Sequence, residues 1–342
     1  MTLQRVLLKF AAMVFAGIVL AASQASMSAA QVDPHRPLKV ALVLPGPVSD
    51  GTFNSAAAKG IKAAEAKYPN ITVSIRENTG MAQSEAAMFE YASNGYDVVI
   101  GHGFQFAEGA KKIHSQFPKT WFIINTAKIA EAPNLASFDN RWGDGGYVAG
   151  AIAGLLTKTG TIGAVGGIPV PVIQEYNEGF ERGAKRTRPE VKVLSAYVGS
   201  FSDVAKAKEI TLAMIEKGAD VVTATGNESV IGTVEAAKEK GVLMIGTAFD
   251  SASFAPDTIV TTVLVNFDVN IDLAIGKILD GTIKPESYVL GFNENGIGLA
   301  GTVSSMTRFR QPTRQRSRPS STKSRRARQR IFRNSANDPD GH

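Results

Sequence analysis

The sequence predicts an α/β protein made of two doubly wound parallel-sheet lobes joined by a hinge. The first observation is that residues 37–126 alternate short apolar strands with amphipathic helices, an order that builds a parallel sheet. The second is that the alternation restarts at residue 147, after a glycine-rich segment at residues 139–146. Parallel α/β sheets bind ligands at the carboxyl ends of their strands, so we expect a ligand site in the cleft between the lobes.

The first half of the chain opens with an aliphatic run at residues 38–44, closed by Pro45 and Gly46, which predicts a buried strand. After a polar loop at residues 49–54, a helix rich in alanine is expected at residues 53–68. The same patterns continue through this half, with strands expected at 71–75, 96–100 and 121–124 and helices at 83–93 and 107–116.

The second half begins after a strand expected at residues 135–138, where segment 139–146 forms the first crossing between lobes. Helices are then expected at 147–157, 172–185, 204–217 and 229–240, and strands at 161–165, 191–198, 220–224, 242–245 and 259–264. A helix at 269–279 is expected to return to the first lobe, before a last strand at 288–292. We therefore expect residues 37–139 plus 264–303 in the first lobe and 140–263 in the second, with several connections forming the hinge.

The N-terminal residues have the pattern of an export signal. Arg5 and Lys9 precede an uncharged, mostly apolar run at 10–22, and Ser28-Ala29-Ala30 offers small residues at a cleavage point. The apolar run is shorter than the roughly 20 residues that a spanning helix needs, so we interpret residues 1–30 as a signal peptide. The chain contains no cysteine, which excludes disulfides, thiolate metal sites and a lipid acceptor. We expect a soluble periplasmic protein rather than a lipoprotein.

Residues 304–342 form a tail of different composition. Ten arginines and one lysine oppose two aspartates after residue 304, so this segment carries a net charge of +9, whereas the whole chain carries +6. The remaining body is mildly acidic, which does not favour nucleic acid as a partner. The tail is interpreted as a disordered basic extension or as the product of a frameshift in GC-rich DNA. Nucleic-acid binding ranks last, because an exported protein seldom meets nucleic acid.

The order of several short motifs resembles the basic membrane protein family. The motifs read KVALV at 39–43, SDGTFN at 49–54, GSFSD at 199–203, KGADVV at 217–222 and AAKEKGV at 236–242. The family consists of substrate-binding proteins of ABC transporters, many of which bind purine nucleosides. The similarity runs from about Leu38 to Val303.

This resemblance implies a type I periplasmic-binding-protein fold that closes on a nucleoside or a similar small molecule. Such a protein delivers its ligand to an ABC permease in the inner membrane, catalyses nothing and needs no cofactor. We expect a monomer. A dinucleotide cofactor is also disfavoured by the sequence, because Gly163, Gly166 and Gly167 lack the Gly-x-Gly-x-x-Gly spacing.

The first lobe supplies four candidate ligand-binding residues at its strand ends. The resemblance implies that Phe53 stacks on the base of the ligand. Asp50 and Asn54 flank it, and each either hydrogen-bonds the ligand or, for Asp50 above all, caps the helix. His102 lies in a glycine-rich loop after the third strand and is interpreted as a ligand-lining or polar loop residue, because no metal-binding pattern accompanies it.

The second half supplies four more candidates. The resemblance implies a second aromatic wall at Phe201, so that two rings from opposite lobes sandwich a flat ligand. Gly226 leaves room for a close backbone approach, and Asp250 suits a ribose because a carboxylate accepts from two adjacent hydroxyls. Trp142 is an extra aromatic candidate whose alternative role is packing at the hinge.

Two positions depart from the family pattern, so a ligand other than a purine nucleoside remains an alternative. Asn125 stands where the family often has an acid that reads the base, and Val265 stands where it has a lysine. The alternatives are another heterocycle, a sugar or a nucleoside hydrolase activity, for which Asp50 and Asp250 would have to converge. A sugar-responsive repressor would need a DNA-binding helix pair where the signal peptide is found.

Overall fold

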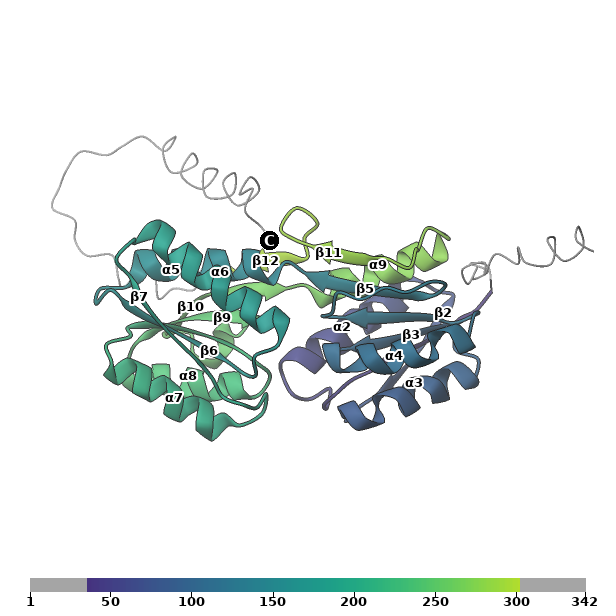
Figure 1. The fold of residues 1–342 in the computed structure, drawn as a ribbon, viewed down its shortest axis with the longest axis horizontal. Coiled ribbons are helices and arrows are strands. Elements are labelled where there is room, and N and C mark those ends of the chain that lie inside the picture. The colour runs from purple at the N-terminus through teal and green to yellow at the C-terminus, as the bar shows by residue number, and fades with distance from the viewer. Residues whose placement is uncertain (1–35, 302–342) are drawn as a thin grey trace, which may run out of the picture.

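The computed structural model describes residues 36–301, apart from the side chain of Ser253. Figure 1 shows two α/β lobes side by side, the first drawn mainly in purple and blue and the second in teal and green. The expected signal peptide (1–30) and arginine-rich tail (304–342) lie outside the described residues, so both stay predictions. No described helix has the length and apolar character that crossing a membrane requires.

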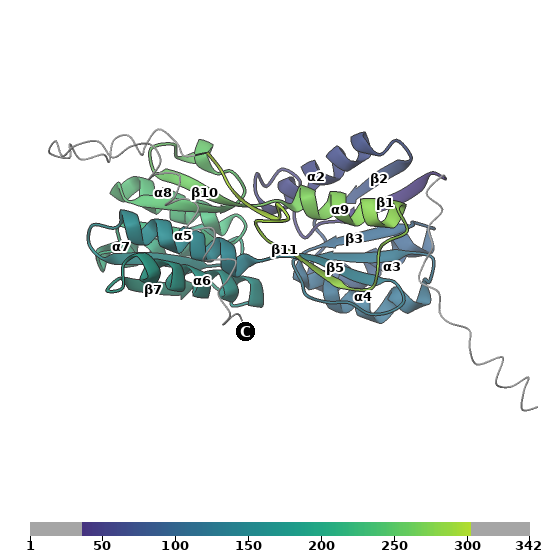
Figure 2. The ribbon, with the colours of Figure 1, turned by 90° about the horizontal axis from the view of Figure 1, so that it is seen from above.

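The first lobe is built on a six-stranded parallel sheet in the order β11-β5-β4-β3-β1-β2. Its strands are β1 (Leu38–Val43), β2 (Ile71–Arg76), β3 (Val98–His102), β4 (Trp121–Asn125), β5 (Leu135–Asn140) and β11 (Ser287–Leu290). Its helices are α2 (Phe53–Lys67), α3 (Ser84–Ser93), α4 (Ala107–Ile113) and α9 (Phe267–Leu279). The helix α9 returns from the second half of the chain to lie beside α2, as Figure 2 shows.

The second lobe repeats the architecture in the strand order β12-β10-β9-β8-β6-β7. Its strands are β6 (Thr161–Gly166), β7 (Lys192–Tyr197), β8 (Val221–Thr225), β9 (Leu243–Ala248), β10 (Ile259–Val265) and β12 (Ile297–Leu299). Its helices are α5 (Trp142–Leu156), α6 (Pro171–Thr187), α7 (Val204–Glu216) and α8 (Ser229–Lys240). Only β12 among the described strands of this sheet runs antiparallel to its neighbour. The predicted fold class is confirmed.

The end of the fold differs from the expected division between lobes. We expected all of residues 264–303 in the first lobe, but β12 pairs with β10 and therefore completes the second sheet. Ile297 is buried against the second lobe's core, which explains why the chain crosses back. The sequence offered little signal for this strand, because it is only three residues long and has Gly298 at its centre.

Three crossings join the lobes, and one buried hydrogen-bond cluster connects them. The crossings follow β5, β10 and β11. Asn140 Nδ2 donates to Asn270 Oδ1 (3.2 Å) and to the carbonyl of Gly296 (2.9 Å), while Asn270 Nδ2 donates to Asn140 Oδ1 (2.8 Å). Because each residue lies in or next to a different crossing, the cluster links the three connections.

The helices α5 and α6 pack at unusually close range through glycines. Gly146 and Gly150 of α5 face the backbone of α6, while Gly179 and Gly183 of α6 face the backbone of α5. A Cβ atom at Gly150 would lie 1.8 Å from the carbonyl oxygen of Phe180, so no side chain fits there.

Candidate functional site

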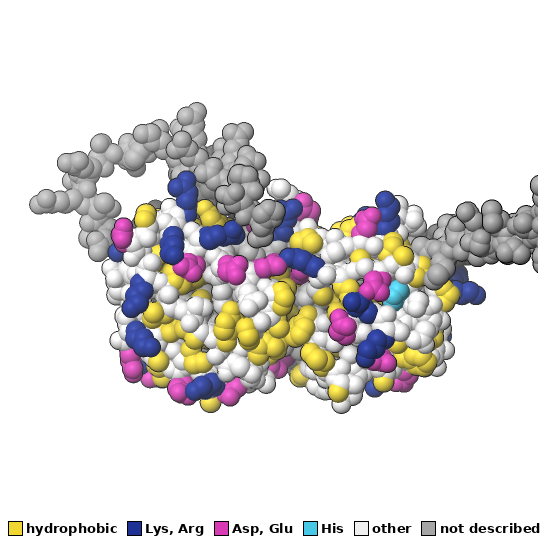
Figure 3. Space-filling model, viewed as in Figure 1, with side chains coloured by type: hydrophobic (Ala, Val, Ile, Leu, Met, Phe, Trp, Pro, Cys, Tyr) yellow, Lys and Arg dark blue, Asp and Glu magenta, His cyan; other side chains and the backbone are white. Residues whose placement is uncertain are grey.

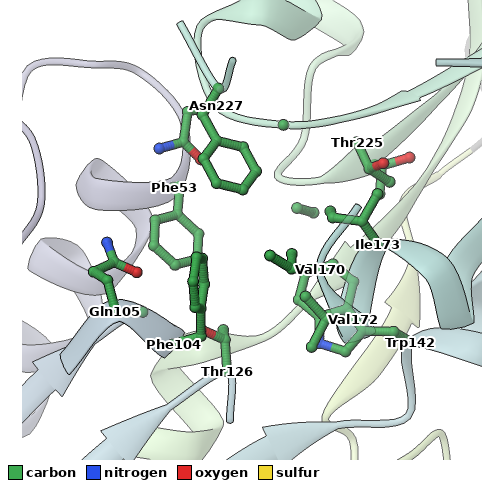
Figure 4. A pocket seen from close by; sticks show the side chains of 15 residues that line it. Phe53, Phe104, Gln105, Thr126, Trp142, Val170, Val172, Ile173, Thr225 and Asn227 are labelled. Atoms are coloured by element: carbon green, nitrogen blue, oxygen red, sulfur yellow. The ribbon is translucent and has the colours of Figure 1, made fainter. Parts of the chain in front are cut away.

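A cavity lies between the lobes at the carboxyl ends of the parallel strands. The empty space among its lining residues, including the part open to solvent, is about 590 Å³. Fifteen residues from both lobes line it: Phe53, Gly103, Phe104, Gln105, Thr126, Trp142, Val170, Val172, Ile173, Phe201, Thr225, Gly226, Asn227, Thr247 and Ala248. In Figure 4 the first-lobe side chains face the side chains of Val172, Ile173 and Thr225 across open space.

Aromatic side chains dominate the walls of the cavity. Phe53 is the first residue of α2, Phe104 begins the turn after β3, and Phe201 lies in the loop between β7 and α7. The rings of Phe104 and Phe201 approach across the lobes, with centroids 6.3 Å apart and planes inclined by 57°. On the face shown in Figure 3, hydrophobic side chains also gather along the junction of the lobes. The cavity therefore suits a flat, largely apolar ring.

Four of the sequence-predicted residues line this one cavity: Phe53 and Phe201, Trp142 and Gly226. The expected pairing of one aromatic ring from each lobe is thus present in the geometry, although ligand contact itself stays a prediction. Trp142 also packs at the hinge, where its ring is 6.5 Å from that of Phe267. A Cβ at Gly226 would lie 2.4 Å from Ser229 Oγ, so a side chain there would require the Ser229 hydroxyl to move.

Asp50 does not line the cavity, because its carboxylate is fully used within its own loop. It accepts hydrogen bonds from the backbone amides of Thr52, Asn54 and Ser55 and from the side chains of Thr52 and Asn54. Burial alone would raise the pKa of the Asp50 carboxyl, but the backbone hydrogen bonds together hold it below its usual value. Of the two expected roles, the structure shows the helix-capping one.

Asn54 does not line the cavity either. Its Nδ2 donates to Asp50 Oδ2 at 2.8 Å, and the side chain is buried beneath the loop. The expected ligand contact by Asn54 is therefore absent from the cavity wall, because the residue takes part in the same cap as Asp50.

His102 and Asn125 form a buried layer behind Phe53 rather than part of the wall. The imidazole stacks on the Phe53 ring, with centroids 3.9 Å apart and planes inclined by 25°. His102 Nε2 lies 3.1 Å from the Phe53 carbonyl, and Asn125 Nδ2 lies 3.4 Å from His102 Nδ1. A tautomer protonated at Nε2 satisfies both contacts, with Nδ1 accepting from the amide. Burial lowers the pKa of His102 to about 3, so the ring is neutral.

Asp250 lies outside the cavity as well. It is exposed in the loop after β9, where its Oδ1 accepts from the backbone amide of Ala252 at 3.2 Å. The expected ribose contact is therefore not part of this wall, and Asp50 and Asp250 do not meet there as a catalytic pair. Val265 is buried in the core of the second lobe, which explains an apolar residue at this position.

Residues 38–327 match the family model described as "ABC transporter substrate-binding protein PnrA-like". The chain belongs to this family. The predicted resemblance to basic membrane proteins is thereby confirmed, and the match continues beyond Val303, where we expected it to end.

Relatives of this PnrA-like protein agree with the family assignment. Basic membrane protein A2 of Borrelia garinii subsp. bavariensis is 30% identical over 229 residues, covering 66% of this chain and 67% of the relative. A purine-binding protein of Brucella abortus is 27% identical over 266 residues, covering 77% and 75%. The crystal structure of an ABC transporter solute-binding protein from Aeropyrum pernix K1 has a TM-score of 0.71 at 24% identity, covering 78% and 77%, and shows the same fold.

Membership in the PnrA-like family establishes the broad class of this protein. It is an ABC transporter substrate-binding protein, a class that works outside the cytoplasm with a small-molecule ligand and a membrane permease. The family is one of solute-binding proteins rather than enzymes. Within the described residues no group of three or more histidine, aspartate or glutamate side chains is placed to hold a metal ion.

Sequence reasoning missed several wall residues of this PnrA-like protein, above all Phe104 and Asn227. Phe104 directly follows Gly103, whose φ of +129° sets the turn, and Asn227 follows Gly226. The sequence could have pointed to both residues, because each lies just beyond the end of a predicted parallel strand. The polar His102 two residues before Phe104 was the more conspicuous candidate, but its side chain lies on the inner side of the loop.

Proposed function

We propose that this protein is a periplasmic solute-binding protein that holds a purine nucleoside between its lobes and delivers it to an ABC importer in the inner membrane. The observation that carries the proposal is the set of three phenylalanines, Phe53, Phe104 and Phe201, that two lobes contribute to one cavity. A flat heterocycle that binds among these rings stacks on them through its π-faces, and its apolar surface is removed from water. The purine-binding relative supports a purine as that heterocycle.

Closure of the lobes completes the site. The ligand first stacks against one lobe, and rotation about the hinge then brings the second aromatic wall onto it. Lys128 of the first lobe and Glu175 of α6 form an ion pair across the lobes at 2.5 Å. Both side chains are more than one third exposed, so the pair adds at most about 1 kcal/mol. Contacts with the ligand therefore supply most of the driving force for closure.

Polar side chains around the cavity match the edges of a base. Gln105 and Asn227 carry amides that both donate and accept hydrogen bonds, and Thr225 adds a hydroxyl. Amides read a heterocycle whose edge alternates donors and acceptors, as a purine does. In this proposal the amides replace the acid that the family often uses, whose position is held here by the buried Asn125.

The mature protein in this proposal is a soluble monomer of the periplasm. Export removes residues 1–30, so the secreted form begins at Gln31. Mass spectrometry of protein recovered from the periplasm measures this N-terminus directly and also shows whether the arginine-rich tail at 304–342 is retained.

The test begins with a thermal-shift screen of the purified protein against nucleosides, free nucleobases and sugars. A ligand present at one hundred times its dissociation constant adds about 2.7 kcal/mol to the free energy of unfolding. Calorimetric titration of Phe53→Ala and Phe201→Ala should then show losses of about 1–3 kcal/mol in nucleoside binding. Phe89→Ala is the control, because Phe89 is exposed on α3 outside the cavity. Unchanged affinity in both cavity variants would reject the proposal.

A further inference from the structure

A second chamber adjoins the aromatic cavity. The two share Phe104, Thr126, Val170 and Val172 in their walls, so they are direct neighbours in the cleft. The second chamber differs in chemistry because charged residues also line it: Glu108, Lys128, Asp139 and Glu175. Lys128 is already engaged by Glu175, so its positive charge is neutralised at this position.

Asp139 is the unusual member of this chamber. It lies near the end of β5, at the first crossing between lobes, and is fully buried. Its Oδ1 accepts from the backbone amide of Asn140 (2.8 Å) and from Trp142 Nε1 (3.1 Å). Its Oδ2 is buried and has no hydrogen-bond partner among the residues that the structure describes. A buried acceptor without a partner is unfavourable, and native proteins rarely leave one unexplained.

The chemistry of Asp139 defines what would complete it. An ionised carboxylate accepts hydrogen bonds and donates none, so its partner must carry O–H or N–H groups. Burial raises the pKa of Asp139 to about 6, which leaves it mainly ionised at neutral pH. A sugar hydroxyl meets this requirement, and one carboxylate oxygen accepts from two of them.

We propose that Asp139 binds the hydroxyl groups of the ligand's sugar in the second chamber while the base occupies the aromatic cavity. This inference rests on the proposed nucleoside function and assigns the sugar a site. It differs from the family resemblance, which implies the ribose contact at Asp250, an exposed residue outside both chambers.

Trp142 links the two chambers in this arrangement. Its ring lines the aromatic cavity, while its Nε1 donates to Asp139 and fixes the orientation of the carboxylate. Trp142 is therefore a positioning residue for the sugar site as well as a wall of the base site. The same side chain makes the placement of the base and the recognition of the sugar interdependent.

The test compares adenosine, adenine and D-ribose binding by the wild type, Asp139→Asn and Asp250→Asn. Asp139→Asn keeps the shape and the hydrogen bonds of Oδ1 but replaces the free acceptor by a donor. We expect it to weaken adenosine binding by roughly tenfold to a hundredfold, with adenine binding unchanged. Asp250→Asn should bind adenosine as the wild type does.

Trp142→Phe is a second variant that keeps an aromatic ring, although a smaller one, and removes the Nε1 donor. It should lower adenosine affinity more than adenine affinity, which a merely structural defect would not do. Wild-type adenosine affinity in Asp139→Asn, or an equal loss for adenosine and adenine, would overturn the sugar site while leaving nucleoside binding intact. A third outcome is that D-ribose binds but adenosine and adenine do not. If Asp139→Asn then weakens D-ribose binding, the sugar site is supported and the nucleoside function is rejected. If none of the probes binds to the wild type, both are rejected.

Discussion

The imidazole of His102 lies almost parallel to the ring of Phe53, on the side away from the cavity, at a centroid distance of 3.9 Å. The same imidazole faces the carbonyl of Phe53 through Nε2 at 3.1 Å. Both the side chain and the backbone of Phe53 are therefore held by one neutral histidine. A ligand that stacks on the open face of Phe53 meets a ring that is already fixed in orientation, which lowers the entropy lost on binding.

His102→Ala should weaken ligand binding by loosening Phe53, although His102 does not touch the cavity. We expect the loss to be smaller than for Phe53→Ala, about 0.5–1.5 kcal/mol, the usual value of an aromatic pair beyond its buried area. Calorimetric titration with the best nucleoside from the screen measures it. His114→Ala is the matched control, because His114 is also buried but bonds Asn134 far from the cavity wall. Equal affinity losses in both histidine variants would contradict a positioning role.

Acid should destabilise the fold through His102. Burial lowers its pKa to about 3, whereas an unfolded histidine titrates near 6.5. Between these values the unfolded state binds a proton that the folded state does not, so stability falls as the pH falls, by at most about 1.4 kcal/mol per pH unit. Urea unfolding of the wild type and His102→Gln from pH 7 to pH 4 measures this slope. A variant with the same slope as the wild type would show that the histidine does not contribute.

Asp139 should act in the opposite direction. Its pKa is raised to about 6 by burial, and an unfolded aspartate titrates near 3.9. The folded state therefore keeps a proton between about pH 4 and pH 6 that the unfolded state has lost, and this contribution to stability disappears as the pH rises through that window. Asp139→Asn should gain up to about 3 kcal/mol relative to the wild type between pH 4 and pH 7. Parallel unfolding curves for the two proteins at all pH values would disprove this.

The close packing of α5 on α6 should tolerate no methyl group at Gly150. The nearest atom to a Cβ there is the Phe180 carbonyl oxygen at 1.8 Å, so Gly150→Ala must push the helices apart, at a cost of about 1–3 kcal/mol or more. Gly143→Ala in the same helix is the control. Its Cβ would meet its nearest neighbour at an ordinary 3.5 Å, so the better helix propensity of alanine makes it neutral or stabilising by up to about 1 kcal/mol. Chemical denaturation of both variants decides the point.

The sequence predicted every described strand except β12, and the edge of the sheet that carries the cavity, but not which polar side chains face that cavity. Apolar runs such as Leu38–Val43 identify buried strands because a parallel sheet is covered by helices on both faces, and here every residue except Lys39 is buried. Asp50 and Asp250 also follow strands, yet their carboxylates bond backbone amides of their own loops. The choice between a loop amide and the cavity depends on turn geometry and side-chain rotamer, which a residue pattern does not contain.

The paired amides of Asn140 and Asn270 link the connections between the lobes at one point. Asn140, Asn270 and Gly296 lie in or next to the three chain segments between the lobes, so we expect these segments to bend together. We expect changes in this cluster to alter the fraction of the empty protein that is closed, and apparent affinity scales with that fraction. Evolution therefore has a way to adjust the strength of ligand capture, and the signal to a membrane partner, without altering any side chain that the ligand meets.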